Sequence, residues 1–169
     1  MALARRAGMS RAWRWFALAA LVVLADQATK ALVLARFAPG ERLELAPFFN
    51  LVLAYNRGAA FSFLSDASGW QKPLLVAFAV AAAAIVSVLI VRRPGERLLC
   101  TGLALILGGA LGNVIDRLRL GEVVDFFDVH AAGYHWPAFN VADSAITIGA
   151  VLLIVEGFVH SERRARSSL

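Results

Sequence analysis

Side chains able to do chemistry gather in one part of this sequence, residues 108–144, which holds four aspartates, two arginines and two asparagines. The aspartates are Asp116, Asp125, Asp128 and Asp143. The neighbouring run 98–115 carries no charge at all. Ionisable groups among apolar residues cost free energy, so a chain that keeps them there usually needs them for function. Asp125 is the clearest case, because Val-Val and Phe-Phe flank it on either side.

The residue types favour carboxylate chemistry. Two aspartates that lie close together in a partly desolvated site cannot both ionise easily, so one keeps its proton. The ionised partner can then deprotonate a water while the protonated one hydrogen-bonds a scissile carbonyl. The sequence has no GxSxG, no HExxH and no phosphate-binding glycine loop, and its one cysteine, Cys100, lies in an apolar run. We therefore expect an aspartate site that uses no metal and no cofactor.

The composition predicts a membrane protein. Of the 169 residues, 60% are hydrophobic, and the mean hydropathy is +0.69, which exceeds the apolar share of soluble domains. The net charge is +5, but the basic residues form short clusters beside apolar runs instead of one basic face. We expect a single membrane domain over residues 1–169 with no nucleic-acid partner.

Four apolar segments are long enough to cross a bilayer, which takes about 20 residues. They cover residues 13–37, 70–92, 97–118 and 140–160, and they predict an all-α protein with four transmembrane helices. Arginines cluster before the first span, between the second and third, and after the fourth. Because such clusters stay in the cytoplasm, both termini are predicted to be cytoplasmic.

The two remaining connections, 38–69 and 119–139, would then face outward. Residues 41–45 alternate in polarity and 48–55 are rich in aromatic and branched side chains, a pattern typical of a small β-hairpin. The apolar stretch 58–64 predicts a short helix in the membrane interface. We expect 38–69 to form an extracytoplasmic hairpin followed by this interfacial element. We expect 119–139 to be a short link in which Asp128, His130 and His135 lie on the loop surface.

This topology brings the polar residues to one depth. Asp26 and Lys30 lie roughly 20 and 25 Å along the first helix at 1.5 Å per residue, in its outer half, and their i, i+4 spacing allows them to pair. The other polar residues are Asn113, Asp116 and Arg117 at the end of the third span, Asn140 and Asp143 at the start of the fourth, and Asp125 between them. All of them are predicted to meet near the outer interface.

Structural roles are open for several of these residues. Asp26 and Lys30 could be an ion pair without direct chemistry. Asn140 and Asp143 have the spacing of a helix N-cap, which on physical grounds is as good a reading as catalysis for Asp143. Arg117 could extend to lipid headgroups, and Asn113 could link two helices.

The sequence resembles a known family at five blocks that occur in the family's order. These blocks are DQATK at 26–30, NRGAAF at 56–61, GNVIDR at 112–117, VVDF at 123–126 and FNVADS at 139–144. Together they resemble the lipoprotein signal peptidases, or signal peptidase II, which are aspartic proteases of the bacterial inner membrane. The blocks span nearly the whole chain.

The resemblance implies a function and a set of site residues. It implies cleavage of diacylglyceryl prolipoproteins immediately before the lipidated cysteine, close to membrane lipid and near the periplasmic interface, and we expect a monomer. It implies that Asp125 and Asp143 are the catalytic pair, and that the outer segment 38–69 forms a cradle and lid over them. The residues implied to position substrate or support the site are Asn113, Arg117, Asn140, Asn56, Asp116, Asp26 and Lys30.

Two other classes of protein remain as alternatives. A proton-coupled transporter could relay protons through Asp26, Lys30 and Asp116, but it would need polar residues in the cytoplasmic half, where Glu156 stands almost alone. A metal-dependent lipid-modifying enzyme could use Asp125 and Asp128 as a DxxD site, and its activity would be sensitive to EDTA.

Overall fold

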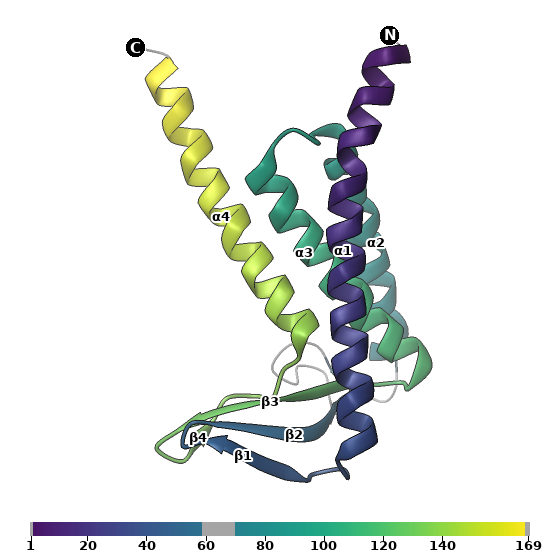
Figure 1. The fold of residues 1–169 in the computed structure, drawn as a ribbon, viewed down its shortest axis with the longest axis vertical. Helices are drawn as coiled ribbons and strands as arrows, with labels where there is room; N and C mark the ends of the chain where they lie inside the picture. The colour runs from purple at the N-terminus through teal and green to yellow at the C-terminus, as the bar shows by residue number, and fades with distance from the viewer. Residues whose placement is uncertain (1, 59–69, 168–169) are drawn as a thin grey trace.

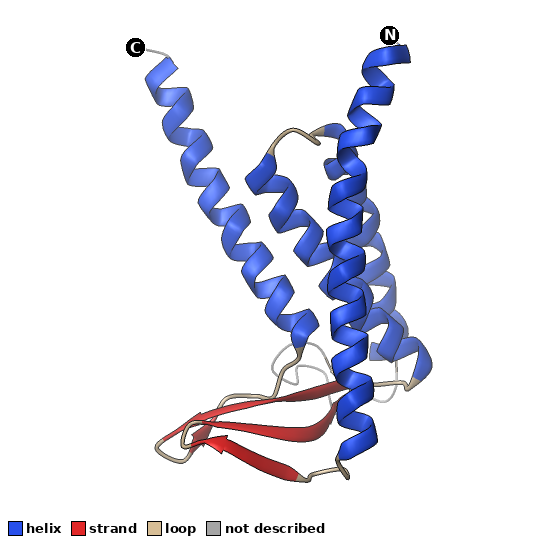
Figure 2. Ribbon diagram, in the orientation of Figure 1, coloured by secondary structure: helices blue, strands red, loops and turns tan. Residues whose placement is uncertain are grey.

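A helix bundle with a small sheet at one end makes up the structure, a computed structural model that describes residues 2–58 and 70–167 (Figures 1 and 2). In these residues the helices are α1 (Ala2–Arg36), α2 (Gln71–Arg92), α3 (Arg97–Arg119) and α4 (Val141–Ser167), and the strands are β1 (Arg42–Ala46), β2 (Phe49–Asn56), β3 (Val123–Ala131) and β4 (Tyr134–His135). The predicted fold class, four transmembrane helices with a small outer sheet, is confirmed. The interfacial helix predicted over 58–64 falls almost entirely outside the described residues.

Within the described residues, four helical stretches are long and apolar enough to cross a membrane. They are Arg11–Arg36, Lys72–Arg92, Arg97–Arg119 and Val141–His160. α1 begins and α4 ends at the same end of the bundle, and the sheet lies at the opposite end (Figure 1). Four crossings with the termini at one end agree with the arrangement that the arginine clusters predict.

α3 is the central helix. It packs against each of the other three helices, and 56% of its most apolar stretch is buried, against 17 to 22% in the others. Small residues permit this approach, since a Cβ on Gly108 would lie 2.6 Å from the Ala19 carbonyl oxygen of α1, and one on Gly109 would collide with the Ala142 carbonyl of α4. α3 is therefore the element that holds the others in register.

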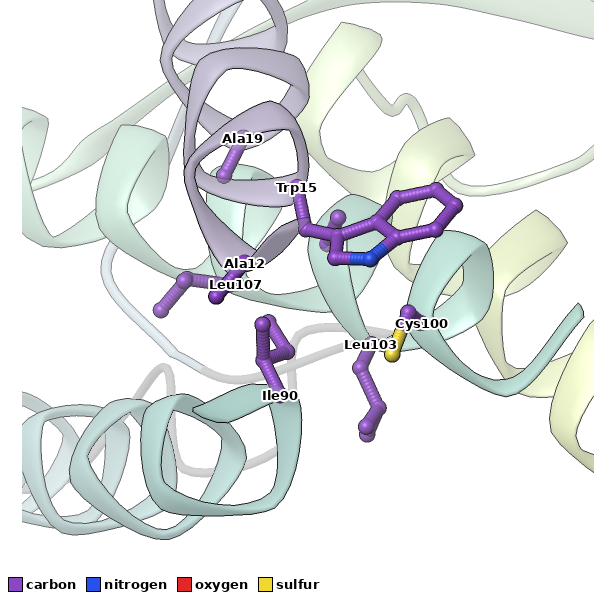
Figure 3. Packing of buried hydrophobic residues seen from close by; sticks show 8 residues of the cluster. Ala12, Trp15, Ala19, Ile90, Cys100, Leu103 and Leu107 are labelled. Carbon is purple, nitrogen blue, oxygen red and sulfur yellow. The ribbon is translucent and has the colours of Figure 1, made fainter. Parts of the chain in front are cut away.

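An apolar cluster joins α1, α2 and α3 far from the sheet. Trp15 from α1, Ile90 from α2, and Cys100 and Leu103 from α3 are its main members (Figure 3). The indole Nε1 of Trp15 donates a hydrogen bond to the Pro94 carbonyl at 3.1 Å, so its polar atom is satisfied while its ring fills the space between helices. This end of the bundle is held by packing.

The sheet is antiparallel in the order β1-β2-β3-β4. The β1–β2 hairpin confirms the strands predicted in the first outer connection. The second connection, expected to be a short link, instead contributes β3 and β4, so the loop predicted around Asp128 was wrong. β3 pairs with the free edge of β2, and that pairing satisfies the backbone groups that an exposed edge would leave open.

An aromatic group ties the sheet to the start of α4. Phe127 of β3 lies 5.8 Å from Phe49 of β2 and 5.5 Å from Phe139, measured between ring centroids. Phe127 and Phe139 also exchange backbone hydrogen bonds of 2.8 and 3.1 Å. Because Phe139 directly precedes the first turn of α4, the sheet fixes where that helix begins.

Candidate active site

Asn140 and Asp143 cap the start of α4. The backbone N–H of Asp143 donates to Oδ1 of Asn140 at 2.9 Å, and the backbone N–H of Asn140 donates to Oδ2 of Asp143 at 3.3 Å. This reciprocal pair is a capping box, so the structural reading of the spacing is confirmed. It engages only one oxygen of Asp143. The other, Oδ1, accepts a 2.8 Å hydrogen bond from the side-chain amide of Asn113 on α3.

Asp125 lies in β3, where it is 3% exposed. Its Oδ1 accepts a 2.7 Å hydrogen bond from Nδ2 of Asn140, and Asn56 of β2 also hydrogen-bonds the carboxylate. Burial raises the pKa of Asp125, the negative charge of Asp143 raises it further, and the two asparagines and Lys30 oppose this only in part. The resulting pKa of Asp125 is about 7, so this carboxyl can hold a proton near neutral pH.

The two aspartates thus come together from separate elements. The charge of Asp143 acts on Asp125, and the amides of Asn113 and Asn140 connect them. Nδ2 of Asn140 reaches Oδ1 of Asn113 at 3.3 Å as well as Asp125. β3, α3 and α4 therefore contribute to one continuous hydrogen-bonded network.

Lys30 lies beneath this network and is 2% exposed. Its Nζ is 2.8 Å from Oδ2 of both Asp26 and Asp116, and it donates to Oδ1 of Asn113 at 3.1 Å. The predicted pairing of Asp26 with Lys30 is confirmed, but the pair belongs to a larger cluster. By holding the oxygen of Asn113, Lys30 turns the amide nitrogen of that residue toward Asp143.

Arg117 points into the site and does not extend to lipid headgroups. Nη2 donates to the Gly58 carbonyl at 2.7 Å, and Nη1 lies 3.4 Å from the Asn113 carbonyl. Its charge interacts with both Asp143 and Asp125. Among the described residues, its buried Nε has no hydrogen-bond partner. That leaves one buried donor of Arg117 available to a bound group.

Asp128 has different partners, although it is only three residues from Asp125. Its carboxylate accepts hydrogen bonds from Asn50 at 2.8 Å and from His135 at 2.8 Å. Burial tends to raise the pKa of Asp128, but the bonds from Asn50 and His135 outweigh it, and the pKa lies below its ordinary value. Residues an odd number apart on a strand face opposite sides, so Asp125 and Asp128 are not placed to share a metal.

Gln27 and Gly112 lie in the blocks DQATK and GNVIDR but were not among the residues predicted to position substrate or support the site. Nε2 of Gln27 donates to Asp116 at 2.8 Å and contacts Asp26 at 3.1 Å. A Cβ on Gly112 would lie 2.6 Å from Oδ2 of Asp26. The signal for Gln27 was its position: a polar side chain beside Asp26, at the depth where the other polar groups were expected to meet.

The described part of the chain thus combines four helices able to cross a membrane with a buried carboxylate network at one end of the bundle. The sequence profile of the Signal peptidase (SPase) II family matches residues 18–159. The lipoprotein signal peptidase of Ralstonia nicotianae is 59% identical over 142 residues, 84% of this chain and 82% of that protein. That of Paraburkholderia phymatum is 55% identical over 154 residues, 91% of this chain and 92% of that protein.

A solved structure of a bacterial membrane enzyme, determined in meso at 2.3 Å, superimposes with a TM-score of 0.79 at 31% identity, covering 89% of this chain and 90% of that one. A second bacterial membrane enzyme, determined in meso at 1.9 Å, gives 0.73 at 33% identity, covering 85% and 91%. The chain belongs to the signal peptidase II family. It is a multi-pass protein of the bacterial inner membrane.

Proposed function

We propose that this chain is an aspartic endopeptidase that removes the signal peptide of diacylglyceryl prolipoproteins, with Asp125 and Asp143 as its catalytic pair. The observation that carries the proposal is the buried carboxyl of Asp125, whose pKa of about 7 reflects burial and the charge of Asp143. A pair that shares one proton near neutral pH is what water activation by carboxylates requires. Family membership supports the substrate class.

In this proposal Asp143 is the base and Asp125 carries the shared proton. Asp143 takes a proton from water while the resulting hydroxide attacks the scissile carbonyl, and Asp125 donates its proton to the carbonyl oxygen. The tetrahedral intermediate then returns a proton to Asp125, and Asp143 protonates the departing amine of the cysteine. Both carboxyls end in their starting states, so no metal, cofactor or covalent intermediate is needed.

The neighbouring polar groups have separate roles. Asn140 and Asn56 hold Asp125, and Asn113 orients Asp143. The Nε of Arg117, which has no partner among the described residues, serves the substrate as a donor to a peptide carbonyl beside the cleaved bond.

The proposed orientation places both termini in the cytoplasm and the site at the periplasmic interface. It is supported by the arginine clusters and by the position of the sheet opposite the chain ends (Figure 1). At this depth the acyl chains of a lipidated cysteine remain in the bilayer while water reaches the carboxylates. The apolar cluster at the other end supplies no route for protons, which argues against a transporter. We expect the single domain of residues 1–169 to act as a monomer.

The test is incubation of the purified protein with a diacylglyceryl prolipoprotein and with the same protein lacking the lipid, each followed by mass spectrometry. We expect loss of the signal peptide at the lipidated cysteine only, unchanged by EDTA. No cleavage of the lipidated substrate would overturn the proposed activity. Cleavage abolished by EDTA and restored by a divalent cation would overturn the metal-free mechanism and favour the alternative metal enzyme.

A further inference from the structure

Each proposed catalytic aspartate directly follows a residue whose backbone is held by a carboxylate of the buried cluster. The backbone N–H of Ala142, before Asp143, donates to Oδ1 of Asp26 at 2.9 Å. The backbone N–H of Val124, before Asp125, donates to the Asp116 carboxylate at 3.1 Å. Ala142 and Val124 are both 0% exposed. Carboxylates from α1 and α3 thus fix the start of α4 and the start of β3.

Two side chains of α1 join these carboxylates. Nζ of Lys30 is 2.8 Å from Asp26 and 2.8 Å from Asp116. Nε2 of Gln27 lies 3.1 Å from Asp26 and 2.8 Å from Asp116, and it also reaches the Gly112 carbonyl at 3.2 Å. A buried lysine between two carboxylates leaves one excess negative charge, and the amide of Gln27 adds donors without adding charge.

Close approach of α1 and α3 is a condition for this arrangement. A methyl group on Gly112 would lie 2.6 Å from Oδ2 of Asp26 and 3.4 Å from the Cβ of Ala142. The Asp26 carboxylate therefore occupies the space that a side chain on α3 would fill, and it reaches the backbone of α4 from there. Any larger residue at position 112 would push that carboxylate away.

We propose that Gln27 and Lys30 join Asp26 and Asp116 into a clamp that sets the separation of Asp125 and Asp143 through the backbones of Val124 and Ala142. Gln27 lies in the block DQATK, and the clamp makes it a positioning residue. The clamp residues do not touch the substrate. The expected effect of the clamp on kcat rests on the proposed function. The hydrogen bonds from the backbone amides of Val124 and Ala142 to the clamp carboxylates do not.

The kinetic test uses Gln27→Leu, which removes the amide while keeping similar bulk and the same net charge. A shift of about 1 Å between catalytic groups can lower the rate of the chemical step about 100-fold, so we expect kcat to fall between about 10- and 100-fold while KM changes less than about twofold. The matched control is Thr29→Val, which removes a hydroxyl whose partners among the described residues are the Ala25 and Asp26 carbonyls on the same helix. Its kcat should equal that of wild type.

A second readout does not depend on activity. Amide hydrogen exchange, followed by NMR at Val124 and Ala142, should be faster in Gln27→Leu than in wild type or Thr29→Val, while the Cys100 amide at the far end of α3 stays unchanged. If Gln27→Leu does not fold, Gly112→Ala supplies the same measurements, because it displaces Asp26 without removing a polar group. Lys30→Met is expected to have the larger effect but leaves two buried carboxylates unpaired.

The outcomes separate the two proposals. Wild-type protein that cleaves nothing, together with faster exchange in the variant, overturns the proposed function and supports the clamp. Active wild-type protein and a Gln27→Leu variant with wild-type kcat and unchanged exchange overturn the clamp alone. Equal acceleration of exchange at Val124, Ala142 and Cys100 would show general loosening and would also overturn it.

Discussion

The two ends of α3 are held by different forces. Near its start, Cys100 and Leu103 pack against Trp15 and Ile90 in an apolar cluster (Figure 3). Near its end, Asn113 and Asp116 take part in ion pairs and hydrogen bonds with three other elements. Dispersion between packed side chains is weakly directional and is spread over many contacts. A buried polar network depends on geometry and leaves costly unsatisfied groups when one member is lost.

Activity and stability should therefore depend on opposite ends of α3. Changes at the apolar end remove contacts that only hold helices together. Changes at the polar end alter charge and orientation where the chemistry is proposed. Variants at the polar end should therefore lower activity, whereas variants at the apolar end should lower stability and leave activity unchanged.

The largest effect is expected at the proposed catalytic pair. Asp125→Asn and Asp143→Asn each remove a proton-transferring group while keeping the shape, and general acid–base groups contribute about 10²- to 10⁴-fold. We expect cleavage of a diacylglyceryl prolipoprotein to fall at least about 10³-fold, with a folded protein in detergent by circular dichroism. Wild-type turnover by either variant would show that the pair is not catalytic.

The pH dependence should follow the proton on Asp125. The pKa of this carboxyl is raised to about 7, so the proton is present below pH 7 and is lost above it. We expect kcat/KM to decrease about tenfold per pH unit on the alkaline side, as for one required proton. The same raised pKa makes Asp125 favour folding at low pH and lose that contribution as the pH rises through 7. A rate that is flat from pH 6 to 9 would contradict the assignment.

Asp128→Asn is a matched test, because it changes an aspartate of the same strand outside the proposed site. The bonds from Asn50 and His135 should be weakened, at a stability cost of about 1–3 kcal/mol, while cleavage stays within about twofold of wild type. Thermal unfolding and initial rates measure the two effects. A loss of activity comparable to that of Asp125→Asn would show that Asp128 belongs to the active site as well.

The smallest effect on activity is expected at the apolar end. Leu103 is 3% exposed, and Leu103→Ala should cost about 2–5 kcal/mol by leaving a cavity. The measurement is the unfolding temperature, with kcat determined well below it, where we expect the wild-type value. A large fall in kcat at full folding would show that the two ends of α3 are coupled.

Much of the fold could be predicted because it follows from periodic patterns. The four apolar runs, the β1–β2 hairpin and the common depth of Asp26, Asn113 and Asn140 all come from spacing and hydropathy. β3 could not be predicted in this way. Its run Val123 to Phe127 does not alternate, since it is buried on both sides, and its pairing with β2 depends on residues about 70 positions earlier in the chain.

The sequence predicted which residues form the site more readily than how these residues contact one another. Asp125 and Lys30 could be predicted as site residues because they are charged and lie in apolar runs. The spacing of polar residues in the sequence could not show that Lys30 contacts two carboxylates at once. Gln27 and Gly112 lie in two of the matched blocks, but their contacts with Asp26 and Asp116 depend on the three-dimensional fit of α1 against α3. The roles of Asp125 and Asp143 stay predictions until they are tested by substitution.

The capping of α4 by Asn140 has a consequence for biogenesis. Asn140 both hydrogen-bonds Asp125 and caps the start of the last helix. The proposed catalytic pair therefore has no fixed geometry until that helix is in place. During synthesis, three helices would already be inserted, with the sheet strands at their outer end, while the pair of Asp125 and Asp143 is still incomplete. A partly inserted chain would therefore be unable to cut neighbouring proteins, and hydrolysis would begin only when assembly is finished.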